Sequence, residues 1–390
     1  MSQHQIFRDA QEFLSQEQLP GWLIYDYRHS NPIFWQAVTP SGHVTRPCFL
    51  YIPAAGMPQL LVHHVDAGKF AESGIDQLVY RNRQIMLEYL RQLLSGISTV
   101  AMEYSPQNEL PRVSRVDAGT IELVRSLGVE VVSSADLMQY ATQRWTPAQL
   151  DGHRRAADTL GQIVGEAFDY IGRHSLSEYD VADYIRRRYK EMGLVAADGP
   201  IVAADEHSAD PHYEPAPEGS HIFQPGDWVL IDLWAKEREE DAVYADITWV
   251  AYIGDRVPER RQQIFDIVVG ARDAALKYLE GSFRQGMAVQ GWQVDAVARQ
   301  YIEERGYGPY FTHRLGHSIS YEVHGEAVNL DGFETHDTRR IIPGIGFSIE
   351  PGIYLPDEFG MRSEIDVYMS ESGPYASSPV QREVVLIRRS

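Results

Sequence analysis

The first third of the chain alternates short apolar runs with turn-forming and charged residues. Four apolar runs bounded by Pro, Gly, Asn or charged residues predict strands over 22–25, 49–52, 60–62 and 99–102. Between them, residues 83–95 and 115–127 carry apolar side chains at a spacing of about 3.6 positions, which predicts helices. This alternation predicts an α/β domain over residues 1–143.

A second set of helices follows a boundary near Arg144. The segment Thr146-Pro147-Ala148-Gln149 has the composition of a helix N-terminus, with Thr as the cap, Pro in the first turn and Gln placed to return a hydrogen bond. We expect helices over 147–172, 177–193, 258–281 and 290–306. Residues 144–390 are therefore expected to form a second domain.

The second domain contains an internal repeat. Residues 225–232 and 343–350 both start with Pro-Gly and run through an apolar strand to a carboxylate. The same offset of 118 positions relates Asp246 to Glu364, which lie on the following strand of each copy. Two helices precede each pair of strands. The repeat predicts an α+β domain made of two helix–helix–strand–strand halves, related by a pseudo-twofold axis.

This symmetry brings four carboxylates toward one axis, those of Asp232, Asp246, Glu350 and Glu364. Any one of them alone is more simply explained as the polar end of a strand at the surface. Four at matched positions among Val, Ile, Leu and Phe must be protonated, paired or bound to a metal. Because neither copy of the Pro-Gly strand contains Lys or Arg, we expect a metal. Such ligands suit Mn²⁺, Co²⁺, Fe²⁺ or Zn²⁺.

Composition narrows the class of protein and its location. The 390 residues are 44% hydrophobic and 23% charged, as in a typical globular protein. A formal net charge of −20 and a pI near 5.1 give no basic footprint for nucleic acid and disfavour anionic membranes. The single cysteine, Cys48, excludes an intrachain disulfide, and no apolar run resembles a secretion signal or a membrane span. We therefore expect a cytoplasmic protein.

Three histidines lie between the two pairs of carboxylates. His313, His317 and His324 fall within twelve positions, and Gly316 with its β-branched, Ser-rich continuation favours a loop that enters a strand. A single histidine is usually structural or exposed. Three of them inside the repeat that supplies four acids favour a functional site.

The order and context of these residues resemble the pita-bread metallopeptidases, in the branch of creatinase, prolidase (Xaa-Pro dipeptidase) and aminopeptidase P. The resemblance is carried by Leu-Ile-Asp232, Ala-Asp246-Ile-Thr248, His313-x-x-Gly-His317, His324, Ile-Glu350-Pro351-Gly352-Ile-Tyr354 and Met-Arg362-Ser-Glu364. It runs from about Arg144 to the C-terminus, and residues 1–143 resemble the N-terminal domain of the same branch. The resemblance implies a metal-dependent peptidase.

The resemblance also implies five metal ligands: Asp232, Asp246, His317, Glu350 and Glu364. They would hold two divalent ions, with Mn²⁺ favoured and Co²⁺ or Zn²⁺ accepted, and Asp246 and Glu364 would bridge the pair. The ions would lower the pKa of a shared water, so that a bridging hydroxide attacks the peptide carbonyl. Glu350 would be catalytic, carrying the proton from that water to the leaving nitrogen.

Further roles follow from the same resemblance. His324 would contact the scissile peptide and stabilise developing negative charge, and His212 would line the substrate pocket and take part in catalysis. His313 would lie beside the proline pocket, and Arg362 would hold a substrate carboxylate or lock a metal ligand. Thr248 would hydrogen-bond a ligand. Structural roles compete with each of these.

Several positions depart from the usual family pattern, and none of them is a ligand. Leu233-Trp234 stands where a Gly is common, residues 236–241 lengthen the hairpin between the two Asp ligands, and Trp249, Ser318 and Ser320 replace the common residues. We expect these differences to affect which substrate is bound rather than whether metal is bound.

The favoured function is hydrolysis of Xaa-Pro dipeptides, with proline-containing di- or short peptides as substrates and a homodimer implied by the resemblance. An Xaa-Pro aminopeptidase acting on longer peptides is the alternative. A creatine amidinohydrolase lacks the ligand set, and a non-catalytic binding protein would typically have lost ligands that this chain retains. A dipeptidase must also neutralise its substrate's carboxylate. Arg362, Arg28 and Arg46 are candidates, although the last two are more simply surface charges.

Overall fold

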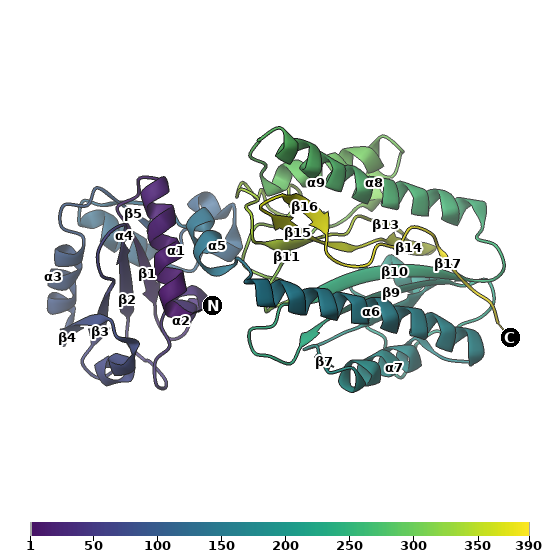
Figure 1. Cartoon of the computed structure of the whole chain (residues 1–390), viewed down its shortest axis with the longest axis horizontal. Coiled ribbons are helices and arrows are strands. Elements are labelled where there is room, and N and C mark those ends of the chain that lie inside the picture. The colour runs from purple at the N-terminus through teal and green to yellow at the C-terminus, as the bar shows by residue number, and fades with distance from the viewer. Residues whose placement is uncertain (1, 390) are drawn as a thin grey trace. The chain divides into compact units, whose positions relative to one another are not determined.

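The structure is a computed structural model that describes residues 2–389. It divides into two compact units, Met1–Arg144 and Trp145–Ser390 (Figure 1). Each unit buries its own hydrophobic clusters, two in the first unit and three in the second. Among residues 2–389, no helix combines the length and the apolar character that crossing a membrane requires.

The first unit is built on one mixed sheet with the strand order β4-β3-β2-β1-β5-β6. Its strands are β1 (Gly21–Asp26), β2 (Cys48–Pro53), β3 (Gln59–His63), β4 (Asp76–Tyr80), β5 (Thr99–Met102) and β6 (Glu130–Ser133). Its helices are α1 (Gln3–Gln16), α2 (Pro32–Ala37), α3 (Arg83–Leu93), α4 (Ala118–Ser126) and α5 (Ala135–Thr142). The four predicted strands and two predicted helices are present. The unit also contains α1, α2, α5, β4 and β6, which were not predicted from the sequence.

Both faces of this sheet are covered because its central strands are apolar on both sides. On β1, Trp22 and Ile24 pack in the cluster that includes α1, α2 and α5. Their neighbours Leu23 and Tyr25 pack in the cluster that includes α3 and α4. Alternate residues of a strand point to opposite faces, so one apolar strand serves two layers of helices. The result is a three-layer α/β unit.

The second unit contains two pairs of helices at the predicted places: α6 (Pro147–Arg173), α7 (Glu178–Glu191), α8 (Glu259–Arg284) and α9 (Gly291–Glu303). The capping box that opens α6 is formed as predicted, since Thr146 Oγ1 accepts from the Gln149 N–H and the Gln149 side chain accepts from the Thr146 N–H. Ser177 and Asp180 form the same motif at the start of α7.

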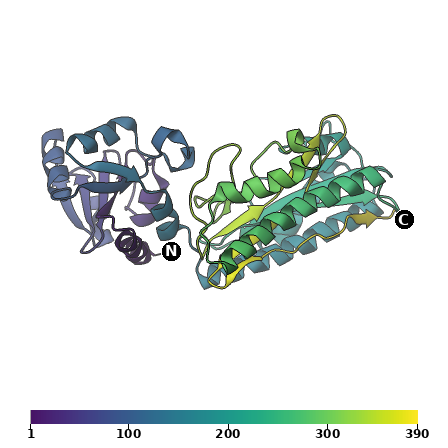
Figure 2. The same cartoon turned by 90° about the horizontal axis from the view of Figure 1, so that it is seen from above.

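Three sheets lie between these helix pairs. The first has the order β17-β10-β9-β7 with β8 also on β9, the second has β11-β12-β15-β16, and the third is the hairpin β13-β14. The bounds are β7 (Leu194–Val195), β8 (Ile201–Ala204), β9 (Trp228–Glu237), β10 (Ala245–Ile253), β11 (Ser318–Ile319), β12 (Gly346–Ile349), β13 (Gly352–Leu355), β14 (Phe359–Arg362), β15 (Ile365–Ser370), β16 (Gly373–Ala376) and β17 (Val385–Ile387). Figures 1 and 2 show α6 and α7 on one side of the sheets and α8 and α9 on the other.

The packing of the two faces of β9 determines the direction in which Asp232 points. Val229, Ile231 and Leu233 pack in the cluster with α6 and α7. Trp228 and Leu230 pack in the opposite cluster, which includes α8, α9 and the second sheet. Asp232 follows Leu230 at the period of a strand, so it faces the inside of the unit, toward the second half of the repeat.

The repeat is present, with one difference between its halves. On β9 and β10, Thr248 pairs with Asp232. The position equivalent to Thr248, Asp366 on β15, pairs with Ser348 of β12 instead of Glu350. The second half is therefore shifted by two residues, and β13 and β14 are inserted between its paired strands. Because the shift is even, every side chain keeps its face and the carboxylates of both halves still converge.

Candidate metal centre

A cavity of about 230 Å³ lies inside the second unit, between the two halves of the repeat. Nine of the residues singled out from the sequence line it: His212, Asp232, Asp246, His313, His317, His324, Glu350, Arg362 and Glu364. Asp198, Ile201, Pro211, Trp234, Arg314, Val323 and Glu334 complete the lining. The repeat therefore brings residues more than 100 positions apart in sequence into one pocket.

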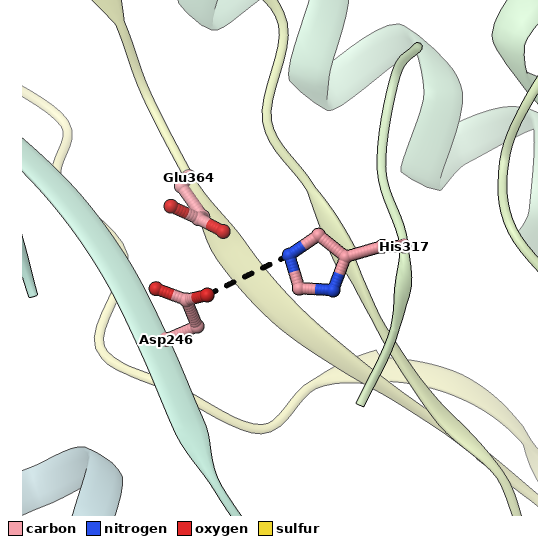
Figure 3. Close-up of side chains that lie close together, drawn as sticks. All are labelled: Asp246, His317 and Glu364. Carbon is pink, nitrogen blue, oxygen red and sulfur yellow. Dashed lines mark ion pairs between the residues drawn. The ribbon is translucent and has the colours of Figure 1, made fainter. Parts of the chain in front are cut away.

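Three of the predicted ligands form the tightest group. Asp246 on β10, His317 in the loop before β11, and Glu364 before β15 each offer a ligand atom within 4.8 Å of the other two (Figure 3). His317 Nε2 lies 3.6 Å from Asp246 Oδ2 and 3.4 Å from Glu350 Oε1. All three residues of the group are buried. A buried set of two carboxylates and one imidazole suits a divalent transition-metal ion.

Hydrogen bonds orient His317 and Glu350. His317 Nδ1 lies 3.1 Å from the carbonyl oxygen of Ser318, so this nitrogen donates and Nε2 faces the acids. Ser348 Oγ donates to Glu350 Oε1 at 3.0 Å and accepts from the His317 backbone N–H at 2.9 Å. The Ser348 hydroxyl thus holds both the backbone of His317 and the carboxylate of Glu350.

Three oxygens of the predicted carboxylate ligands are buried without a hydrogen-bond partner among the described residues: Asp232 Oδ1, Asp246 Oδ1 and Glu364 Oε1. Burial, and next the charge of Glu364, raise the pKa of Asp246 well above its ordinary value. Burial and then Glu350 do the same to the pKa of Glu364. Unpaired buried carboxylates are costly unless protonated or bound to a cation. The residues therefore fit a site for hard divalent cations.

Arg362 changes one part of the sequence interpretation. Neither Pro-Gly strand supplies a cation, but β14 does, because Arg362 Nη2 donates to Asp232 Oδ2. Arg362 Nε also donates to Thr248 Oγ1 at 3.0 Å, and Thr248 donates to Glu364 Oε2 at 2.7 Å, which is the ligand bond predicted for Thr248. Of the two roles considered for Arg362, these contacts match the locking of a ligand.

His313 belongs to the same network through Tyr354. Arg362 Nη1 donates to Tyr354 Oη at 2.9 Å, and Tyr354 Oη lies 2.8 Å from His313 Nε2. His313 Nδ1 lies 2.6 Å from the carbonyl oxygen of Arg314, so Nδ1 carries the proton and Nε2 accepts from Tyr354. Burial lowers the pKa of His313 to about 4, which keeps the ring neutral. Both ring nitrogens of His313 have hydrogen-bond partners, so the residue presents an aromatic surface to the cavity.

The other two histidines are exposed at the cavity. The His324 ring meets the His317 ring edge to face, with 4.4 Å between centroids and 70° between planes. The His212 N–H donates to Asp210 Oδ1 at 2.9 Å, which fixes the backbone of the loop that carries it. Arg28 and Arg46, the other candidates for binding the substrate carboxylate, belong to the first unit and do not line this cavity. Arg28 lies over the Tyr27 ring, and Arg46 hydrogen-bonds Thr45.

Three charged lining residues, Asp198, Arg314 and Glu334, were not singled out from the sequence, whereas Trp234 was noted as a difference that concerns the substrate. Trp234 follows Asp232 by two positions, so strand periodicity places it on the same face, and its Nε1 donates to Asp198 at 3.0 Å. Arg314 directly follows His313, which was predicted to lie in the site. Asp198 and Glu334 come from separate loops, and no local pattern in the sequence marks them.

Comparison with known proteins agrees with this geometry. The sequence profile of metallopeptidase family M24 matches residues 151–371. The probable dipeptidase PepE of Mycobacterium tuberculosis (strain ATCC 25618 / H37Rv) is 25% identical over 347 residues, which cover 87% of this chain and 85% of that protein. An uncharacterized peptidase of Staphylococcus epidermidis (strain ATCC 12228 / FDA PCI 1200) is 32% identical over 216 residues, 54% of each chain.

Solved structures share the fold over nearly the whole chain. Dipeptidase PepE from Mycobacterium ulcerans superposes with a TM-score of 0.73 and 23% identity, covering 99% of this chain and 98% of that one. Prolidase from Thermococcus sibiricus superposes with a TM-score of 0.67 and 20% identity, covering 99% of both chains. The predicted architecture, an α/β N-terminal unit followed by an α+β pita-bread domain, is confirmed.

Proposed function

Because the chain belongs to metallopeptidase family M24 and is therefore a peptidase, we propose that it hydrolyses the Xaa-Pro bond of dipeptides. Asp232, Asp246, His317, Glu350 and Glu364 hold two divalent ions, Mn²⁺ by preference with Co²⁺ or Zn²⁺ as substitutes. The observation that carries this proposal is the group of buried, unpartnered carboxylate oxygens around His317 Nε2 in one small cavity. When bound, such ions polarise water and the peptide carbonyl, so that water attacks at neutral pH.

Glu350 moves the proton in this scheme. Burial acts to raise the pKa of Glu350, but the neighbouring His317 imidazole and the guanidinium groups of Arg362 and Arg314 lower it below its ordinary value. The carboxylate is therefore ionised and accepts a proton from the attacking water. It then returns that proton to the nitrogen of the leaving proline, since the tertiary amide nitrogen must be protonated to leave.

The histidines bind and orient the substrate. His324 packs against the ring of His317 and lines the cavity, so its imidazole is near enough to the metal ligands to donate to the carbonyl oxygen as negative charge develops there. His212 lies at the exposed rim and His313 offers a neutral aromatic face, suited to the apolar proline ring. These three roles remain proposals.

The size of the cavity favours a short substrate. Its volume of about 230 Å³ is below the roughly 300–1,000 Å³ of pockets that take drug-sized ligands. Trp234, hydrogen-bonded to Asp198, occupies part of the lining on the same strand face as Asp232. A homodimer is the assembly we expect, and light scattering of the purified chain tests it.

The test compares three peptides under one set of conditions. Metal-depleted protein is assayed with Ala-Pro, Ala-Pro-Ala and Ala-Ala, with and without added Mn²⁺. The proposal predicts metal-dependent hydrolysis with Ala-Pro as the preferred substrate. A preference for Ala-Pro-Ala would identify an Xaa-Pro aminopeptidase instead, and a preference for Ala-Ala would mean a dipeptidase without proline specificity.

A further inference from the structure

Two guanidinium groups line the cavity, and they differ in how fully their hydrogen-bond donors are used. All three nitrogens of Arg362 are engaged, with Asp232, Thr248 and Tyr354 as side-chain partners. Arg362 is also buried, with 3% exposure. Releasing it for a substrate would leave a buried carboxylate without its counter-charge. Arg362 is therefore a poor choice for binding an arriving anion.

Arg314 has donors to spare. Its side chain is 24% exposed, and its Nη1 donates to Glu334 Oε2 at 2.8 Å. Among the described residues, neither Nε nor Nη2 has a hydrogen-bond partner, and Nε is buried. A buried N–H without a partner carries a free-energy cost that a bound acceptor would remove. Arg314 is thus the lining guanidinium, within residues 2–389, that has two nitrogens without a hydrogen-bond partner.

Glu334 holds Arg314 in place from two directions. Its Oε1 accepts from the Arg314 backbone N–H at 3.0 Å, and its Oε2 accepts from the guanidinium. The buried carboxylate of Asp331 accepts from the Glu334 N–H at 2.9 Å and from two neighbouring N–H groups, which fixes this loop. Glu334 itself is 40% exposed and lines the same cavity. A carboxylate that binds Arg314 would therefore be repelled by the negative charge of Glu334.

We propose that Arg314 binds the C-terminal carboxylate of the dipeptide through Nε and Nη2, and that Glu334 both orients Arg314 and weakens that binding by repulsion. The inference rests on the proposed function. A guanidinium offers parallel donors that match a carboxylate, whereas the other charged side chains of the cavity, apart from Arg362, are acidic. Arg314 thus selects substrates that end one residue after the cleaved bond, because a longer chain carries an amide in place of that carboxylate.

A purely structural role for the Arg314–Glu334 pair makes different predictions. If the pair only ties two loops together, removing either partner weakens the same contact and changes all substrates alike. If Arg314 binds the carboxylate, removing Arg314 and removing Glu334 have opposite effects, and only on substrates with a free carboxylate. The sign of the Glu334 effect therefore separates the two roles.

The experiment measures KM and kcat for Ala-Pro and for Ala-Pro amide with Arg314→Gln, Arg314→Lys and Glu334→Gln. Arg305→Gln, which removes an exposed arginine outside the cavity, is the control. We expect Arg314→Gln to raise KM for Ala-Pro by roughly 10- to 100-fold, the range for losing a hydrogen bond to a charged group. Arg314→Lys restores part of the loss, Glu334→Gln lowers KM for Ala-Pro, and the amide is unaffected by any of them.

A binding measurement tests the role of Arg314 independently of catalysis. Calorimetry on the metal-loaded full chain compares proline with prolinamide, which are not hydrolysed. The wild-type chain should bind proline more tightly, and Arg314→Gln should lose this preference while its thermal unfolding stays cooperative. Equal binding of the two ligands to the wild type would overturn the inference, as would equal KM changes for Ala-Pro and its amide. If the wild type hydrolyses another dipeptide, Xaa-Pro specificity fails, and that dipeptide and its amide test Arg314 in the same way.

Discussion

Thr248 Oγ1 donates a hydrogen bond to Glu364 Oε2 at 2.7 Å, and this bond joins the two halves of the repeat across the metal centre. Thr248 lies on β10 of the first half and is itself the acceptor of a bond from Arg362 Nε. The Glu364 backbone N–H also approaches the Thr248 carbonyl oxygen at 3.3 Å. One strand residue therefore positions both the Glu364 carboxylate and the Arg362 guanidinium.

Replacing Thr248 by Val tests this relationship. Valine keeps the shape of the side chain but removes the donor to Glu364 and the acceptor for Arg362. We expect the affinity for Mn²⁺ to fall by about 10- to 100-fold, as for other residues that orient metal ligands. Calorimetric titration of metal-depleted protein measures it. Thr248→Ser retains the hydroxyl and should bind Mn²⁺ nearly as well as the wild type, so equal losses in both variants would contradict the role of the hydrogen bond.

The ion pair between Arg362 and Asp232 is buried, so its two partners should be strongly coupled in stability. Arg362→Met leaves a buried carboxylate without a counter-charge and should lower the free energy of unfolding of the metal-free protein by about 3–5 kcal/mol. Adding Asp232→Asn should recover most of that loss. Urea unfolding in the presence of a chelator measures all three variants. A double variant no more stable than Arg362→Met would show that the pair is not coupled.

Glu350 should govern turnover more than folding. Replacing Glu350 by Gln removes the group that accepts and returns the proton and should lower kcat for Ala-Pro by ~10²- to 10⁴-fold. Glu358→Gln makes the same chemical change at an exposed residue paired with Arg260, and its kcat should match that of the wild type. A Glu350→Gln variant with near wild-type turnover would mean that another group carries the proton.

Stability should depend on the protonation of His153, a fully buried residue of α6. Its Nδ1 lies 2.7 Å from the Tyr244 carbonyl oxygen and its Nε2 lies 2.8 Å from Ser377 Oγ. Burial lowers the pKa of His153 from 6.5 to about 4. Asp366 Oδ2 is 3.8 Å away, but burial raises the pKa of Asp366, so it does not supply a counter-charge.

The sign follows from proton uptake. Between about pH 6.5 and 4 the unfolded chain binds a proton at this histidine and the folded chain does not, so the free energy of unfolding falls as the pH falls. The loss attributable to His153 should be about 2 kcal/mol at pH 5 relative to pH 8. Urea unfolding at both pH values measures it, with His153→Gln as the comparison. The variant should lose less stability than the wild type over this interval; an equal loss would contradict the assignment.

Local chemistry explains why much of the fold was predictable. The Thr146 capping box and the start of α7 at Ser177 depend on contacts within four residues, so the sequence specifies them directly. The repeat predicted the convergence of the acids because equivalent segments fold alike. α1 was also within reach, since Ile6, Ala10 and Phe13 follow the spacing of one buried helix face.

The long-range contacts of the site were not predictable in the same way. Arg362 and Asp232 are 130 positions apart and belong to different sheets, so no local pattern links them. The resemblance offered Arg362 as a residue that could lock a metal ligand, but nothing in the sequence identified Asp232 as its partner. Arg314 and Glu334 meet for the same reason, through a loop whose path is set by the Asp331 carboxylate. These contacts depend on tertiary packing.

The most direct test of the central claim is a count of metal ions. Metal-depleted wild-type chain, Asp246→Asn and Glu364→Gln are titrated with Mn²⁺, Co²⁺ and Zn²⁺, and bound metal is quantified after gel filtration. We predict two ions per chain in the wild type, as in two-metal hydrolases, and loss of tight binding in both variants. Without metal, both variants should unfold at higher urea than the wild type, because a buried charge is removed. A wild-type chain that retains none of the three metals, or an Asp246→Asn chain that binds them as well as the wild type, would contradict the account.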